Sequence, residues 1–146
     1  MAGGNHLTLF GVYVSESVFE TLADVLYEEA GVIDLETYFD PTDSSVPPGD
    51  PGAKATNALI DDVVTTFAAL YDEADFEAAR RVDADGFVLV HLAGTPAAVS
   101  RARELFRAAG TIQETDLRTV QTAILEAYCD RQDGVASTDN SVRPKT

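Results

Sequence analysis

The chain has 146 residues, with 25 aspartates and glutamates against 10 lysines and arginines, so its net charge is −15 with both histidines neutral. This length is typical of one domain with a hydrophobic core, and we expect a single α/β domain over residues 1–131. The charge disfavours binding to nucleic acids and to anionic membranes, because both require clustered lysine and arginine, and no basic stripe runs along the sequence.

Lysine is almost eliminated from the sequence. Lys54 and Lys145 stand against eight arginines. In a chain with so large a net charge, the surplus carboxylates repel one another in dilute buffer, whereas molar salt shortens the screening length to about 3 Å. The composition resembles that of proteins from salt-in haloarchaea and predicts a halophilic protein; a high-GC bacterial genome is the alternative explanation of the arginine preference.

Two further features bear on localisation and redox chemistry. The N-terminal segment MAGGNHLTLFGVYV lacks the basic region and cleavage site of a signal peptide, and no apolar run is long enough to span a bilayer. We therefore expect a cytoplasmic protein. Cys129 is the single cysteine, so no internal disulfide forms, and the sequence predicts neither a metal site nor a cofactor.

The first elements are a strand and a helix. Residues 7–14 are β-branched and aromatic, which indicates a strand. A helix over residues 17–30 follows, because apolar side chains recur there at helical spacing. Ser17 and Glu20 have the spacing of a capping box, and Gly31 is expected to end the helix.

A second strand is predicted over residues 32–39. Ile33, Leu35 and Thr37 alternate there with Asp34, Glu36 and Tyr38 in the period of a strand. Residues 40–53 hold four of the six prolines and show no periodicity, so they predict a long loop.

The middle of the chain carries the strongest amphipathic pattern. Asp50 and Pro51 are typical of a helix start, and the apolar residues that follow predict a helix over residues 51–72. A short helical segment begins at Asp75. Residues 87–92, FVLVHL, then predict a buried strand.

The last third is predicted to be mainly helical. Thr95 caps a helix that Gly110 is expected to end, and residues 111–114 are a candidate short strand. A final helix is predicted over residues 117–131. Residues 132–146 have no hydrophobic pattern and are expected to form a disordered tail.

The two strand–helix–strand units resemble each other. Aligning Gly31 with Gly110 also aligns Tyr27 with Phe106. Two such units predict a ferredoxin-like split-βαβ sheet of four antiparallel strands with two additional helices. A three-layer α/β/α sheet of parallel strands is the alternative, since strands and helices alternate throughout.

The second unit, FVLVHLAGTPAAVSRARELFRAAGTIQE, also resembles repeats of small general-stress proteins of α/β type. The resemblance implies a stress or regulatory role. It implies no individual functional residue.

A ferredoxin-like sheet leaves one face bare, and Tyr13, Leu89 and His91 are expected on it. Additional helices or a second subunit would cover this face. No nucleophile accompanies His91, so we expect no catalytic residue. If a pocket exists, we expect it between the sheet and the loop at residues 40–53, with Tyr38 beside Tyr13 and His91.

These observations lead to three hypotheses. The first is a non-enzymatic cytoplasmic protein that acts through self-association or through a protein partner. The second is a small-molecule sensor or small enzyme with a pocket near the 40–53 loop. The third is a salt-adapted structural or viral component.

The charge predicts that folding depends on salt. We expect the melting temperature to rise as KCl increases from about 0.1 M to about 2 M, because screening removes repulsion among the surplus carboxylates. Circular dichroism at increasing KCl concentration measures this rise. A variant with Glu28→Gln and Glu29→Gln should show a weaker salt dependence, and a melting temperature that is independent of salt would contradict the prediction.

Overall fold

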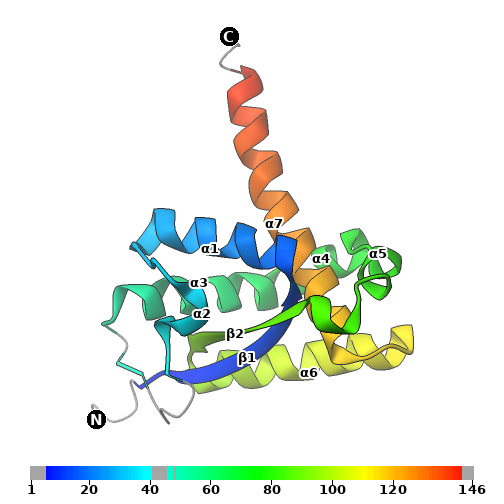
Figure 1. Ribbon diagram of the computed structural model, residues 1–146, viewed down its shortest axis with the longest axis horizontal. Helices are drawn as coiled ribbons and strands as arrows, with labels where there is room; N and C mark the ends of the chain where they lie inside the picture. Colours follow the sequence, from blue (N-terminus) through cyan, green and yellow to red (C-terminus); the bar gives the residue numbers. More distant parts are fainter. Residues whose placement is uncertain (1–5, 41–45, 48, 143–146) are drawn as a thin grey trace.

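The structure of the protein is a computed structural model that describes residues 6–40, 46–47 and 49–142, with only the backbone of Ala84 and of residues 132–142. It is a mixed α+β fold (Figure 1). In chain order the elements are β1 (Thr8–Ser15), α1 (Glu16–Ala30), α2 (Leu35–Tyr38), α3 (Pro51–Thr65), α4 (Phe67–Glu73), α5 (Phe76–Arg80), the 3-10 turn η2 (Ala84–Gly86), β2 (Phe87–Gly94), α6 (Pro96–Gln113) and α7 (Leu117–Val142).

The two strands form an antiparallel ribbon that lies against the helices. Each residue of β1 pairs with one of β2, from Thr8 opposite Gly94 to Ser15 opposite Phe87. Because side chains alternate along a strand, the ribbon has two different faces. One face is apolar and packs on α1, α3, α6 and α7. Its side chains from the two strands are Phe10, Val12, Val14, Val88, Val90 and Leu92.

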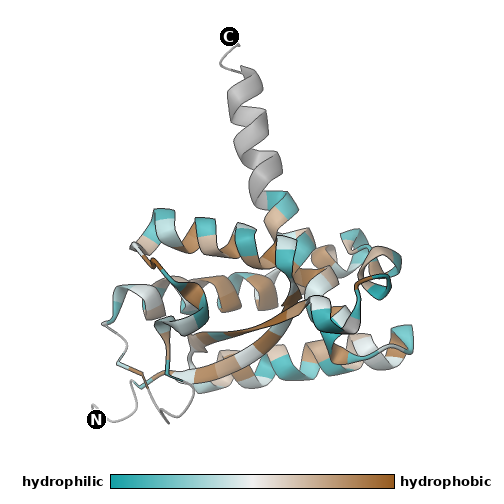
Figure 2. Ribbon diagram, in the orientation of Figure 1, coloured by the Kyte–Doolittle hydropathy of each residue, from teal (hydrophilic) through white to brown (hydrophobic). Residues whose placement is uncertain are grey.

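Hydropathy follows this arrangement. In Figure 2 the hydrophobic residues lie on the strands and on the helix turns that face them, while hydrophilic residues occupy the outer turns. The amphipathic spacing read from the sequence therefore orients the helices around one core. α7 lies deepest in this core, with consecutive turns contributing Val120, Ile124 and Tyr128.

The helix caps are partly those expected. Asp50 Oδ2 accepts a hydrogen bond from the Ala53 N–H at 3.0 Å, and Thr95 Oγ1 accepts from the Ala98 N–H at 3.2 Å. The capping box of Ser17 and Glu20 is wrong, because β1 runs directly into α1 and Ser15 is the N-cap. The Ser15 side chain accepts from the Val18 N–H, so Ser17 lies inside the first turn.

The strand predicted over residues 32–39 is wrong. Val32, Leu35 and Phe39 are buried there, with the spacing of a helix, and Leu35–Tyr38 forms α2. Ile33, which the alternating pattern placed on one face with Leu35 and Thr37, is 87% exposed, whereas Leu35 is buried.

The strand predicted over residues 111–114 is also wrong. α6 continues through Gly110 to Gln113 and ends at Glu114, which adopts the left-handed conformation with φ of 55°. Gly110 instead allows close packing, because a Cβ there would lie 3.3 Å from the Thr115 carbonyl oxygen. Gly31, by contrast, is a left-handed C-cap with φ of 72°.

The four-stranded ferredoxin-like sheet is therefore not confirmed. Among the described residues, β1 and β2 are the strands of the sheet, and Leu7 adds an isolated bridge to Val46. The two aligned units also differ in burial, since Tyr27 is 57% exposed and Phe106 is buried. The three-layer parallel sheet fails as well, because the two strands are antiparallel.

Two predicted helices differ in length. The helix expected over residues 51–72 is interrupted at Thr66, which separates α3 from α4. The final helix begins at Leu117 as expected, and its backbone continues to Val142 within the segment predicted to be a disordered tail. Residues 143–146 of that tail lie outside the described residues.

Side chains of neighbouring helices bond the backbone of one residue on each outer edge of the ribbon. On β2, the buried Thr56 hydroxyl lies 2.9 Å from the Ala93 carbonyl oxygen, to which it donates, and accepts from the Ala93 N–H at 3.0 Å. On β1, Gln121 Oε1 accepts from the Tyr13 N–H at 2.9 Å, and the Thr122 hydroxyl donates to the Tyr13 carbonyl at 3.4 Å. Neither edge offers a free template for another strand at these positions.

We expect Thr56→Val to lower the free energy of unfolding by about 1–3 kcal/mol, because it leaves the buried N–H and carbonyl of Ala93 without their partner. Thr56→Ser keeps the hydroxyl and loses one methyl group, which costs about 1 kcal/mol or less. Urea unfolding in molar KCl measures both values. Equal stability of Thr56→Val and the wild type would show that the hydroxyl contributes nothing.

Candidate functional site

The face of the ribbon opposite the core is the candidate site. Its exposed or partly exposed residues are Gly11, Tyr13, Phe87, Leu89 and His91, which we call the open face. Tyr13 stands directly opposite Leu89, and Gly11 opposite His91. The structure therefore brings together three of the four residues that the sequence singled out.

The open face is apolar and accessible at its centre. Tyr13 is 41% and Leu89 is 39% exposed, although each lies on a strand whose other side faces the core. Cross-strand pairs of this kind have Cβ atoms about 5 Å apart and form a continuous surface. The tyrosine and leucine thus present a joint apolar patch with a histidine beside it.

One end of the same side of the ribbon is already covered. Leu7, Phe39, Val46, Ala53 and Ala93 form a second buried cluster, against which Leu9 packs. Phe39 and Val46 therefore cover this end, and the centre stays exposed.

Tyr38, the fourth predicted residue, belongs to this cover and not to the open face. Its hydroxyl donates to Asp50 Oδ2 at 2.8 Å, and its ring lies so close to Gly52 that a Cβ there would be 2.3 Å from Tyr38 Cε2. Burial and the Asp50 carboxylate together raise the pKa of Tyr38 above 10.0, so the phenol stays protonated at neutral pH. Tyr38 thus holds the start of α3.

The pocket proposed beside the 40–53 loop depends on chain that the structure does not describe. Residues 41–45 and 48 of this loop lie outside the described residues. Within the described part, the Tyr38 hydroxyl is directed to Asp50 and not to His91.

Charge distinguishes the open face from the rest of the surface. The two longest stretches without aspartate or glutamate are residues 1–15 and 86–103, and they contain β1 and β2. At one end of the face, the Arg118 guanidinium lies 5.1 Å from the centre of the Phe87 ring and 3.3 Å from Asp116. The ribbon is thus free of acidic side chains in a chain of charge −15.

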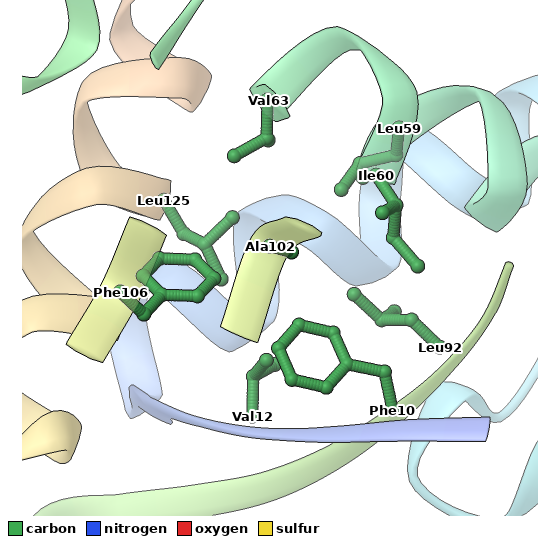
Figure 3. A pocket seen from close by; sticks show the side chains of 9 residues that line it. All are labelled: Phe10, Val12, Leu59, Ile60, Val63, Leu92, Ala102, Phe106 and Leu125. Atoms are coloured by element: carbon green, nitrogen blue, oxygen red, sulfur yellow. The ribbon is translucent and has the colours of Figure 1, made fainter. Parts of the chain in front are cut away.

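A small apolar cavity lies on the other side of the ribbon and offers no room for a ligand. Its volume is about 10 Å³, at the lower limit for a single water molecule, and its lining is apolar. Figure 3 shows the lining side chains pointing toward one another from the strands and three helices: Phe10, Val12, Leu59, Ile60, Val63, Leu92, Ala102, Phe106 and Leu125. This space is a small packing defect of the core.

The shifted titratable groups of α7 lie away from the open face. Burial, together with the carboxylates of Asp62 and Glu29, raises the pKa of Tyr128 to about 12. Burial also raises the pKa of Glu126, and Asp130 and Asp75 add to the shift. The raised pKa values of both groups reflect the close packing of α7 against the other helices.

Among residues 6–40, 46–47 and 49–142, no group of three or more histidine, cysteine, aspartate or glutamate side chains is arranged to hold a metal ion. No helix in the described part of the chain combines the length and the apolar composition needed to cross a bilayer.

Sequence reasoning did not identify Gly11 or Arg118 as parts of this surface. Gly11 could have been found as a glycine at an outward position of a predicted strand. Arg118 gave no such signal, because its position over Phe87 depends on how α7 crosses the end of the ribbon. Comparison of the chain with protein-family models, with curated proteins and with solved structures gives no match.

We expect Tyr38→Phe to lower the free energy of unfolding by about 0.5–1.5 kcal/mol, because the hydrogen bond to Asp50 is lost while the ring remains. The bond requires a protonated phenol whose pKa is raised on folding. The difference from wild type should therefore be constant below pH 10.0, the ordinary tyrosine pKa, and shrink as the pH rises through the folded-state pKa.

Urea unfolding between about pH 6 and about pH 11 measures this pH dependence. Tyr27→Phe is the matched control, since Tyr27 is 57% exposed on α1. The same loss in both variants would show that the Asp50 bond is not its cause.

Proposed function

We propose that the protein is a non-enzymatic cytoplasmic protein of a salt-adapted organism and that it acts through self-association, with the open face as the contact between two copies. The observation that carries this proposal is an apolar, acid-free sheet face on an otherwise strongly acidic chain. Exposed apolar patches of this kind are typical of interaction surfaces.

The distribution of charge supports a second copy of the chain as the partner of the open face. Two chains of −15 repel each other wherever their acidic surfaces meet. At the ribbon, however, each copy presents Tyr13, Leu89 and His91 without a neighbouring carboxylate on either strand. Contact between the two ribbons therefore avoids direct opposition of acidic side chains, and molar salt screens the remaining repulsion.

The bonded edge positions favour one way for the two copies to meet. Strand addition requires free backbone groups at a sheet edge, and Thr56 bonds those of Ala93 while Gln121 and Thr122 bond those of Tyr13. Packing face to face needs no free backbone group, because side chains of two stacked sheets interdigitate about 10 Å apart. A two-fold arrangement would use the same patch on both copies.

We expect light scattering in about 2 M KCl, a concentration at which surface charges are screened, to report twice the mass of the chain. Leu89→Glu should convert this species to the single-chain mass, because it places two carboxylates in the contact. Leu89 is exposed, so the variant should keep the far-UV circular dichroism of the folded protein.

Tyr27→Glu is the matched control, because it adds the same charge at a residue that is 57% exposed on α1. It should leave the mass unchanged. A wild-type protein that remains a single chain at all concentrations in molar KCl would disprove the proposed self-association.

A further inference from the structure

A groove lies between α4 and α6, and none of the described residues that line it belongs to the ribbon. The two helices touch at two places along it. At one, the Phe67 and Phe106 rings meet edge to face with their centres 5.8 Å apart. At the other, the Gln113 side-chain amide donates to the Tyr71 hydroxyl at 2.7 Å. These contacts hold the helices in position, while the surface between them is hollow, with a volume of about 310 Å³.

The lining of this groove is mainly apolar. Phe67 and Ala109 are buried, Leu105 is partly buried, and Ile112 is 69% exposed on the α6 wall. Ala108 is exposed and contributes a single methyl group, so this part of α6 does not fill the space. Sites for small molecules have volumes of about 300–1,000 Å³ and mostly apolar walls with a few polar groups. The groove has the size and the lining of a small site of this kind.

Charge distinguishes one part of the groove. Among the described residues that line it, Asp72 is the charged one, and its exposed carboxylate forms no ion pair with another described residue. Arg80 is connected to the same region, because it donates to the Gln113 carbonyl at 2.9 Å, but its guanidinium is paired with Glu77 at 2.8 Å. The carboxylate of Asp72 and the neighbouring phenol oxygen of Tyr71 therefore make this part of the groove suited to a cation.

We propose that the groove binds a small alkylammonium ion. Its ammonium group pairs with Asp72 beside the Tyr71 hydroxyl, because charge-assisted hydrogen bonds to carboxylates are the strong ones. Its alkyl chain packs against Leu105 and Ile112, where burial of apolar area is favourable. Potassium competes for the carboxylate but not for the apolar wall, so the alkyl chain supplies the selectivity in molar salt. The site is separate from the open face and does not depend on the proposed self-association.

We expect hexylammonium to bind with a dissociation constant of about 1 mM in about 2 M KCl, where general attraction to the acidic surface is screened. Titration into the isotope-labelled protein, followed by NMR, should shift the backbone amide signals of α4 and α6. Hexanol, which lacks the charge, should bind more weakly, and hexanoate should bind least because Asp72 repels it.

Two variants with matched controls locate the site. Ala108→Leu should weaken the binding of hexylammonium and of hexanol at least about tenfold, because its side chain fills the groove; alanine and leucine are both good helix formers. Ala97→Leu, at an exposed α6 residue outside the groove, should leave binding unchanged. Asp72→Asn should weaken hexylammonium about two- to fivefold and leave hexanol unchanged, whereas Asp61→Asn on α3 should change neither.

Three results would overturn the proposal. Equal losses in Asp61→Asn and Asp72→Asn would show that the acidic surface as a whole attracts the cation. Unchanged binding in Ala108→Leu, with the circular dichroism of the folded protein, would place the alkyl chain elsewhere. Hexanoate that binds as tightly as hexylammonium would refute the cationic ligand. A wild-type protein that stays a single chain refutes the self-association alone, since these titrations require no second copy.

Discussion

The antiparallel ladder between β1 and β2 is the interaction on which the rest of the fold depends. It joins the first strand of the chain to one that follows five α-helices, and it places Val12 opposite Val90 in the core. The helices pack on this one apolar face, so the ribbon has an inside and an outside. Loss of the ladder would remove the surface that α1, α3, α6 and α7 share.

Closure of the ribbon edges gives the small sheet a defined boundary. A two-stranded ribbon is marginal in water by itself, and its unpaired backbone groups invite other strands. Here Thr56 and Gln121, from helices on opposite sides, supply side-chain partners to the outer edges of both strands. The backbone groups of Ala93 and Tyr13 are thereby satisfied, while the open face keeps Tyr13 and Leu89 accessible. Bonded edge positions and an accessible face favour stacking over strand addition.

The acidic surface and the open face both follow from the way acidic residues are distributed along the chain. Carboxylates occupy the helices and turns, whereas neither strand carries one. In molar salt the repulsion among exposed carboxylates is screened, and burial of apolar area remains favourable. A chain with this charge distribution repels other copies over most of its surface and can still associate through one face. This is the basis of the proposed function.

The sequence alone determined where the two strands and the long amphipathic helices lie and the caps at Asp50 and Thr95, because each depends on residues near one another in the chain. It also indicated that Tyr13, Leu89 and His91 share a face, since side chains alternate along strands. Tertiary structure decided the rest. Residues 32–39 and 111–114 are short segments in which the local pattern is ambiguous. Leu35, buried in the core, lies in the helical turn Leu35–Tyr38, whereas Ile112 is 69% exposed and simply continues α6. Tyr38 was placed by its bond to Asp50 rather than by its strand-like spacing, because such long-range contacts leave no periodic signal in the sequence.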